Sequence, residues 1–280
     1  MAMLRHLTPL LLTCAVATAI CGSAHADSGA AERYQGRWNY DLPDQATMTN
    51  IAVMNIGDGI QGPQIGDIVF TATGPDRVVG RTDVGCTWRF KSAGDALVLD
   101  GANQTCHNPL AGYAYTMTEW TVRVDGDHET ESIKAISHHG DRDYEFDLAR
   151  GARTRTGEDD PAATAAFTGT WAYGAPDPKS GANIRMSGGA AAPQTGTITV
   201  VANYDDRITA RTDDGCEWTM VTRGDTAKLD PPVQTCTIAD SAVTLRYWTI
   251  VSDGHRQISG VYGTDPGGAA FSIAGDLHRA

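Results

Sequence analysis

Basic residues are scarce in this sequence of 280 residues. It has 22 lysines and arginines against 34 acidic residues, which gives a formal net charge of −12 at pH 7. A chain this acidic repels nucleic acid phosphates and anionic membrane surfaces, so we expect neither as a partner. Beyond residue 26 the sequence also lacks any apolar run near the ~20 residues that cross a bilayer, so we expect no membrane insertion.

Signatures of catalysis are absent as well. The sequence has no Gly-x-Ser-x-Gly and no His-Glu-x-x-His motif. Residues 57–62 match the Gly-x-Gly-x-x-Gly dinucleotide fingerprint, but Pro63 and the strand-like residues 68–70 follow where the fingerprint requires a helix. We therefore predict a loop there, no cofactor and no identifiable catalytic residue. Because catalytic groups on a barrel come from scattered strands, an enzyme of unassigned chemistry stays open as a hypothesis.

The start of the chain carries its longest apolar run. A short positive segment precedes the apolar residues 10–20, and Ala24-His25-Ala26 places small residues where a signal peptidase cleaves. This predicts a signal peptide over residues 1–26 and a secreted or periplasmic protein. A membrane anchor would need a longer run, and lipid attachment at Cys21 is disfavoured by the bulky Ile20 before it.

The remaining sequence is one unit repeated twice. Residues 81–106 and 211–236 are identical at 13 of 26 aligned positions, and all six tryptophans fall in matched parts of the two copies. We expect a tail at 27–33, a first repeat at 34–152 and a second at 167–280. Residues 153–166 are polar and then small, without apolar periodicity, which is typical of a linker.

Each copy has the pattern of a β-sheet protein, and no stretch shows a convincing helical period. Short runs of alternating apolar and polar residues are separated by turns such as Asp125-Gly126 and Asp253-Gly254. This predicts an all-β fold of two tandem antiparallel meanders, each with seven or eight strands. Closure into a small β-barrel would bury one face and remove the exposed edges. A two-sheet sandwich is the alternative.

Four cysteines remain after residue 26, and their spacing is the same in both copies. Cys86 and Cys106 are 20 residues apart, as are Cys216 and Cys236, with matching neighbours. An even number of cysteines in an exported chain favours disulfides. Because a duplicated unit is expected to contain its own bridge, we predict Cys86–Cys106 and Cys216–Cys236. The closely spaced ligand pairs of a zinc site are missing, and no metal is expected.

The ends of each repeat resemble the calycins, the group of β-barrels that includes lipocalins and avidins. Gly-x-Trp opens each copy at Trp38 and Trp171, and an arginine, Arg150 or Arg279, closes it. The resemblance implies a barrel in which the tryptophan packs at the closed end and the arginine lies against it. It thus implies structural pairs of Trp38 with Arg150 and of Trp171 with Arg279.

Residues 138–143 contain two histidines and two aspartates, which are metal ligands by type. Adjacent residues of a strand point to opposite faces, so His138 and His139 are not expected to share an ion. The second copy has no histidine at the matching place. We therefore interpret the segment as a solvated hairpin turn.

Period-two spacing places several large side chains on common strand faces. They either fill the core or line a barrel interior wide enough for one small ligand. The candidates for ligand contact are Trp88, Phe90, Trp120, Trp218, Met220 and Trp248.

Three hypotheses for function follow. The first is a binding protein for a small apolar or amphipathic molecule. The second is a ligand-free interaction module, such as a protease inhibitor or an envelope component, whose protein partner is unknown. The third is the enzyme of unassigned chemistry. The sequence favours binding over catalysis.

Overall fold

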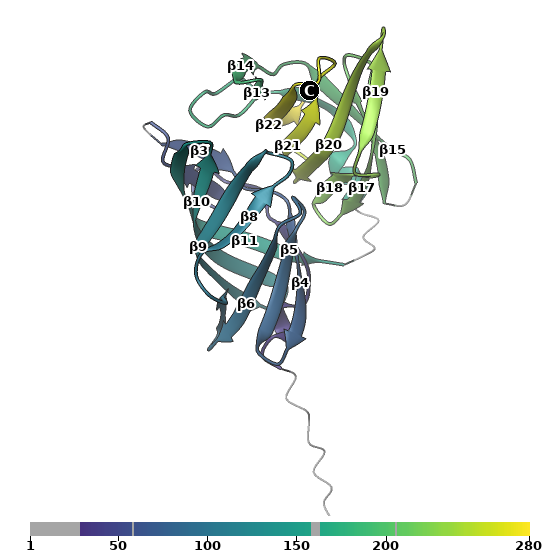
Figure 1. Cartoon of the computed structure of the whole chain (residues 1–280). Coiled ribbons are helices and arrows are strands. Elements are labelled where there is room, and N and C mark those ends of the chain that lie inside the picture. The colour runs from purple at the N-terminus through teal and green to yellow at the C-terminus, as the bar shows by residue number, and fades with distance from the viewer. Residues whose placement is uncertain (1–28, 58, 158–162, 205) are drawn as a thin grey trace, which may run out of the picture.

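The computed structural model describes residues 29–57, 59–157, 163–204 and 206–280. The predicted signal peptide, residues 1–26, lies outside the described residues. The chain folds into two tandem antiparallel β-barrels, as the repeat and its strand pattern predict (Figure 1). Neither of the two short helices among the described residues is long and apolar enough to cross a membrane.

The first barrel is a ring of eight strands in the order β1-β4-β5-β6-β7-β9-β10-β11, closed by pairing of β1 with β11. A β2–β3 hairpin extends β11, and β8 pairs with β9 outside the ring. The elements are η1 (Glu32–Tyr34), β1 (Gly36–Tyr40), β2 (Ile51–Met54), β3 (Ile60–Pro63), β4 (Asp67–Gly74), β5 (Arg77–Thr82), β6 (Thr87–Ala93), β7 (Ala96–Leu99), β8 (Gln104–Asn108), β9 (Tyr113–Asp125), β10 (His128–His139) and β11 (Arg142–Thr156).

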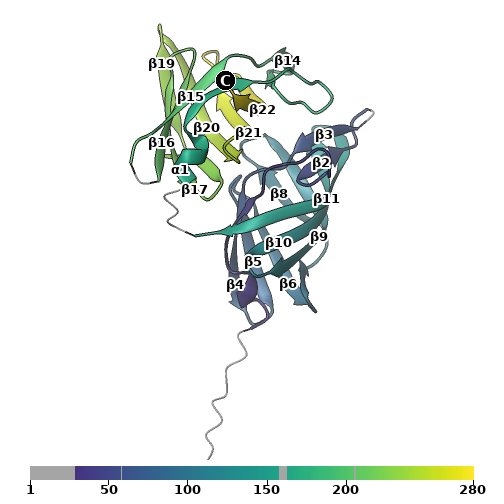
Figure 2. The same ribbon diagram turned by 180° about the vertical axis from the view of Figure 1, so that it is seen from behind.

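The second barrel repeats this ring in the order β12-β15-β16-β17-β18-β20-β21-β22, closed by β12 with β22. Helix α1 lies against β15, β16 and β17 at one end of this barrel (Figure 2). The elements are α1 (Ala163–Phe167), β12 (Gly169–Tyr173), β13 (Ile184–Ser187), β14 (Ala190–Pro193), β15 (Thr197–Ala202), β16 (Arg207–Thr212), β17 (Glu217–Arg223), β18 (Thr226–Leu229), β19 (Gln234–Ile238), β20 (Ser241–Ser252), β21 (Arg256–Thr264) and β22 (Ala270–Arg279).

Both predicted disulfides are confirmed. Cys86 is bonded to Cys106 and Cys216 to Cys236, with Cα atoms 5.7 Å apart in each pair. Each bridge ties the start of one ring strand to a strand outside the ring, β8 or β19. In the chain-entropy description, closing a loop of this length stabilises a barrel by about 3 kcal/mol.

The first barrel reaches further along the chain than its sequence indicates. Strand β11 continues to Thr156, because residues 153–156 pair with β1 to close the ring. The segment predicted as a linker from residue 153 therefore begins inside the barrel, and it ends in α1, where Phe167 is fully buried. At the other end of the repeat, part of the predicted tail forms η1, and Ala31 is buried.

A tryptophan and an arginine stack at one end of each barrel. In the second barrel the guanidinium of Arg279 lies 4.6 Å from the ring centroid of Trp171. In the first barrel the arginine over Trp38 is Arg155, at 4.3 Å, whereas Arg150 donates to the carbonyl oxygen of Thr47. The arrangement is consistent with a calycin-like barrel. The sequence match between Asp147-Leu148-Ala149-Arg150 and Asp276-Leu277-His278-Arg279 points to Arg150, but the stacked arginine of the first barrel is Arg155. The two differ because β11 is longer than β22 and continues to Thr156.

The fingerprint-like residues 57–62 do not open a helix. Ile60–Pro63 forms β3, which pairs with β2 in an antiparallel hairpin. The prediction of a loop is therefore wrong for residues 60–62, which lie in a strand.

Candidate functional site

A cavity of about 280 Å³ lies where the interior of the first barrel meets the wall of the second, and residues of both barrels line it. Its volume is that of roughly nine liquid water molecules at ~30 Å³ each. Most of its wall is aromatic or aliphatic, with a few polar groups, as is usual for small-molecule sites. The large side chains of this wall are Tyr40, Trp88, Tyr115, Met117, Trp120 and Phe146.

A buried ionic cluster lies beside this cavity. Nη1 of Arg153 donates to Oε1 of Glu129 at 2.6 Å and to Oε2 of Glu131 at 2.8 Å. Glu131 also accepts from the Tyr40 hydroxyl and, at 2.7 Å, from Nε1 of Trp120. The Arg153 guanidinium stacks on the Tyr40 ring at 3.9 Å. All five side chains are at most 5% exposed, so the cluster is held dry.

Burial sets the charges of this cluster. Loss of solvation, opposed by Arg153 and reinforced by Glu131, raises the pKa of Glu129 to about 8. Both oxygens of Glu131 are occupied by hydrogen-bond donors, which is the environment of a carboxylate. The cluster thus places two carboxyl groups against one guanidinium, and burial favours the protonated form of Glu129 by raising its pKa.

The strand alternation explains why these polar groups face inward. Glu129 and Glu131 share the inner face of β10 with Ile133, and Arg153 lies opposite Glu129 on β11. A strand presents every second residue to one face. The backbone hydrogen bonds between strands therefore form whichever side chains occupy that face. The inner face can thus carry charge without disturbing the barrel frame.

The second barrel has neutral residues at the same places. The strand register equates Glu129 with Gln257, Glu131 with Ser259 and Arg153 with Leu277. Its core is a continuous cluster of buried side chains around Trp171, Trp218 and Trp248. The duplicated frame therefore surrounds a continuous hydrophobic core in one copy and a buried ionic cluster beside a cavity in the other.

Residues of β20, β21 and β22 of the second barrel form part of the cavity wall, and these strands lie beside one end of the first barrel (Figure 1). Tyr247 on β20 and Tyr262 on β21 line the cavity from outside, with their rings 5.7 Å apart. Between them Gly260 approaches Ile65 of the first barrel, and a Cβ atom at Gly260 would lie 3.2 Å from that side chain. Nearby Ile258, although on the outer face of its barrel, is only 2% exposed.

The equivalent outer positions of the first barrel face solvent. Strand register equates Tyr247 with Glu119 and Tyr262 with Lys134. Glu119 and Lys134 form an exposed ion pair at 3.1 Å, with 67% and 59% of their side chains accessible. The aromatic pair in the second barrel thus replaces a surface ion pair, and the outer wall of that copy is specialised to contact the first.

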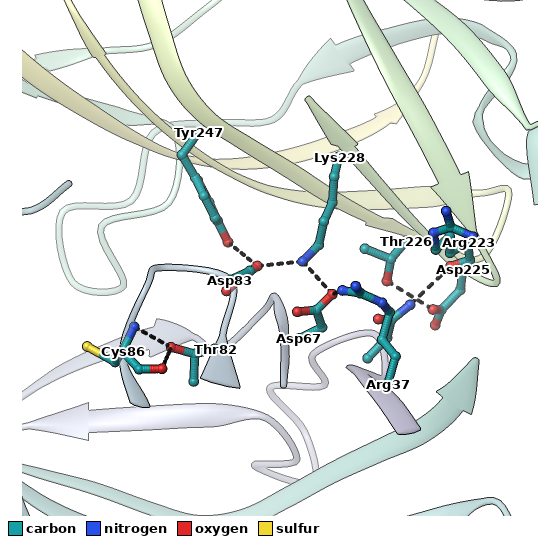
Figure 3. A network of polar contacts seen from close by, with 11 residues as sticks. Arg37, Asp67, Thr82, Asp83, Cys86, Arg223, Asp225, Thr226, Lys228 and Tyr247 are labelled. Carbon is teal, nitrogen blue, oxygen red and sulfur yellow. Dashed lines mark hydrogen bonds and ion pairs between the residues drawn. The ribbon is translucent and has the colours of Figure 1, made fainter. Parts of the chain in front are cut away.

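A network of polar contacts, called the seam below, joins the two barrels beside the cavity (Figure 3). Nζ of Lys228, on β18 of the second barrel, lies 2.7 Å from Asp67 and 2.8 Å from Asp83 of the first. The Tyr247 hydroxyl donates to Asp83 at 3.1 Å, and Arg37 pairs with Asp67. In the first barrel the position of Lys228 is occupied by Val98. The lysine is therefore a feature of the docking contact and not of the shared frame.

Both repeats contain an Arg-Thr-Asp segment, at residues 81–83 and 211–213, and the arginine and aspartate of each described segment do not pair with one another. Among the described residues, Arg211 pairs with Glu217, and Asp83 pairs with Lys228. Asp83 instead lies against Gly66, whose φ of +107° and absent Cβ leave room for the carboxylate. In the second barrel Asp213 approaches Gly196 in the same way. The repeated aspartate thus packs on a glycine turn, and only the first copy uses it between barrels.

Of the six residues predicted to contact a ligand, only two line the cavity. Trp88 and Trp120 line the cavity, whereas Phe90 is buried behind Trp120, with ring centroids 5.1 Å apart. The second-barrel candidates lie in its hydrophobic core and do not line the cavity; they are Trp218, Met220 and Trp248. Ligand contact by any of the six stays a prediction.

Sequence reasoning missed the ionic cluster and the covering wall. The alternation of Glu129, Glu131 and Ile133 on one strand face was a signal for inward carboxylates. Their partner Arg153 was assigned to the linker. For the wall, the signal was the exchange of charged residues in the first copy for tyrosines in the second.

His138 and His139 point to opposite faces of β10, as predicted. His138 lies between Thr116, at 2.8 Å, and Asp143, at 2.7 Å, on the outer surface. His139 stacks on Tyr113, with ring centroids 4.0 Å apart. Within the described part of the chain, no group of three or more potential ligands could hold a metal ion.

Comparison with models of known protein families finds no match, and comparison with curated proteins finds none either. Among solved structures, a protein of unknown function from the DUF3598 family of Nostoc punctiforme PCC 73102 is similar, with 8% identity and a TM-score of 0.27. The alignment covers 90% of this chain and 98% of that one. A protein proposed to be an outer membrane protein, from Bacteroides fragilis NCTC 9343, has 10% identity and a TM-score of 0.28, with 90% and 100% coverage. At such TM-scores neither likeness supports an argument about this chain.

Proposed function

We propose that this chain binds a small amphipathic molecule inside its first barrel, beneath a cover supplied by the second. The observation that carries the proposal is the difference between two copies of one frame. The interior of the first opens to a cavity of about 280 Å³ that has an aromatic wall and is completed by the second barrel, whereas the interior of the second is a continuous hydrophobic core. A cavity that is mainly apolar with a few fixed polar groups suits a ligand with both kinds of surface.

We further propose that the protein acts outside the cytoplasm, in the periplasm or after secretion. The two disulfides support this location, because such bonds persist in oxidising compartments. The start of the sequence, with its apolar run and small residues before residue 27, supports export independently.

The proposal can be tested with the neutral fluorescent probe N-phenyl-1-naphthylamine and the full-length mature protein. Binding at micromolar concentration with a rise in probe emission is expected. Trp88→Ala should weaken binding at least tenfold, because it removes a wall of the cavity. Trp218→Ala, at the equivalent position of the second barrel, is the matched control and should leave probe affinity unchanged while lowering stability by ~3–5 kcal/mol.

A substitution that fills the cavity guards against simple unfolding. Ile133 lines the cavity and is 4% exposed. Ile133→Trp should abolish probe binding while keeping a cooperative melt. Native mass spectrometry of protein purified from its own host should reveal a bound small molecule. Equal probe binding by the wild type and Ile133→Trp would place the probe elsewhere and contradict the proposal.

A further inference from the structure

The wall of the cavity is divided between the two barrels. The first barrel contributes aromatic side chains such as Tyr40, Trp88 and Trp120, and the second contributes Tyr247 and Tyr262. The strands that carry these two tyrosines belong to a ring that closes without the first barrel. A molecule that fills the cavity therefore touches both barrels at once, and it makes all of these contacts only while the barrels are docked.

The direct contact between the barrels is interrupted by empty space. A second cavity, of about 330 Å³, is also lined from both sides, for example by Gln61 of the first barrel and Arg256 of the second. Pro63 and Ala274, one from each barrel, line both cavities and so lie between them. Atoms that face an empty space lack dispersion partners there. The docked arrangement thus gains contacts when a cavity between the barrels is filled.

Several of the contacts that do join the barrels are polar. In the seam, Lys228 links Asp67 to Asp83 (Figure 3). Nδ2 of Asn39 on β1 donates to the carbonyl oxygen of Arg223 on β17 at 3.0 Å. Polar interfaces between the domains of one chain ordinarily permit the domains to move relative to one another. The barrels are therefore joined by contacts of the kind that can open and close.

We infer that occupation of the cavity is coupled to docking of the barrels, so that binding of a ligand holds the second barrel on the first and its release lets them separate. A ligand shifts a conformational equilibrium only through a difference in its affinity for the two states. Here the docked state offers both halves of the wall, and the separated state offers one. Because coupling is reciprocal, a change that favours separation must also weaken ligand binding. The inference rests on the proposed function and adds the response of the molecule to its ligand.

The first barrel supplies the substitutions that test this coupling. It carries Glu119 and Lys134 where the second carries Tyr247 and Tyr262, so Tyr247→Glu with Tyr262→Lys introduces residues that the same frame accepts. This double variant should bind N-phenyl-1-naphthylamine at least tenfold more weakly and still melt cooperatively. The matched control, Glu119→Gln with Lys134→Gln, changes the equivalent exposed positions of the first barrel and should leave probe affinity unchanged.

Energy transfer between two dyes measures the separation of the barrels in the full-length mature protein. Cysteines that replace the exposed Asp95, in the β6–β7 turn, and the exposed Ser241, at the start of β20, carry the dyes. In Lys228→Val, which weakens docking, we expect a separated population that saturating probe lowers at least fivefold. The double tyrosine variant should have a larger separated population and respond little to the probe.

The outcomes separate this inference from the proposed function. If the wild type and the double tyrosine variant bind the probe equally, the second barrel takes no part in binding and the coupling is wrong, while binding in the first barrel stands. If no separated population exists in Lys228→Val or in the double variant, or if the probe leaves that population unchanged in Lys228→Val, the coupling is also wrong. If the wild type binds no probe, the proposed function itself fails, and the inference fails with it.

Discussion

The two barrels have the same ring of eight strands and the same disulfide, yet they have diverged on opposite sides of their walls. The first has changed inside, where Glu129, Glu131 and Arg153 replace the neutral Gln257, Ser259 and Leu277. The second has changed outside, where tyrosines replace an exposed ion pair. The first copy thus has an ionic interior, and the second has an aromatic outer wall that contacts the first.

This difference shows which part of a barrel is free to vary. The ladder hydrogen bonds hold the ring, and every second side chain is independent of them. Inner positions accept charge if every group finds partners, and outer positions accept aromatic residues if another surface covers them. Two copies of one barrel can therefore differ in role: the interior of the first borders the cavity, and the outer wall of the second packs against it.

The largest expected effect comes from removing the cation inside the first barrel. Arg153→Leu introduces the second-barrel residue and leaves the Glu131 carboxylate buried without its guanidinium. We expect the free energy of unfolding to fall by about 3–5 kcal/mol, as when one partner of a buried pair is lost. Urea denaturation of the full-length protein, followed by tryptophan fluorescence, measures the loss.

The triple substitution Glu129→Gln, Glu131→Ser and Arg153→Leu is the matched control. It copies the whole interior of the second barrel, so no charge is left unpaired, and the stability should recover most of the loss. A triple variant as unstable as Arg153→Leu would mean that the two interiors are not interchangeable and that the comparison of copies fails.

The next effect is a pH dependence that belongs to the first barrel. Because burial raises the pKa of Glu129 from 4.5 to about 8, the folded state keeps a proton that the unfolded state loses above pH 4.5. The stabilisation is complete below that pH and declines as pH rises to about 8, by at most ~1.4 kcal/mol per pH unit. Denaturation midpoints measured from pH 4.5 to 9 should show the decline.

Glu129→Gln places the second-barrel amide at this position and should flatten that decline. Asp225 also titrates with a pKa raised to about 6, mainly by burial and by nearby Asp41, so some decline below pH 6 should persist in the variant. A variant with the same slope as the wild type between pH 6 and 8 would refute the assignment to Glu129.

The smallest expected change in stability comes from a substitution in the seam between the two barrels. Lys228→Val copies Val98 of the first barrel and removes the cation that joins Asp67 to Asp83. We expect global stability to change by about 1 kcal/mol and the dissociation rate of bound probe to rise about tenfold. Stopped-flow displacement measures that rate. Lys134→Val, which removes only an exposed pair with Glu119, should alter neither value.

Local patterns made much of the fold predictable. Period-two strands, the repeated motifs and the equal cysteine spacing depend on residues near one another in sequence, and the all-β class, the tandem copies and both disulfides followed from them. Barrel closure depends on pairing between the first and last ring strands, β1 with β11, which are more than 100 residues apart. Sequence alone left a sandwich open for this reason.

The site was predictable only in part. Trp88 and Trp120 were identified because they are large and lie on inward strand faces. Arg153 was missed because its polarity resembled a linker, and its inward direction depends on a strand that extends to Thr156. The role of Lys228 depends on the packing of one barrel on the other, which no local pattern encodes.

The connection between the barrels has a consequence for how readily the cavity opens. Only residues 157–162 separate the end of β11 from the start of α1. Over so short a span, one domain experiences the other at an effective concentration on the order of millimolar. A docking contact with an intrinsic Kd of about 1 mM, roughly 4 kcal/mol, would then keep the mouth closed about half the time. Each ~1.4 kcal/mol gained or lost at the seam would shift that balance about tenfold.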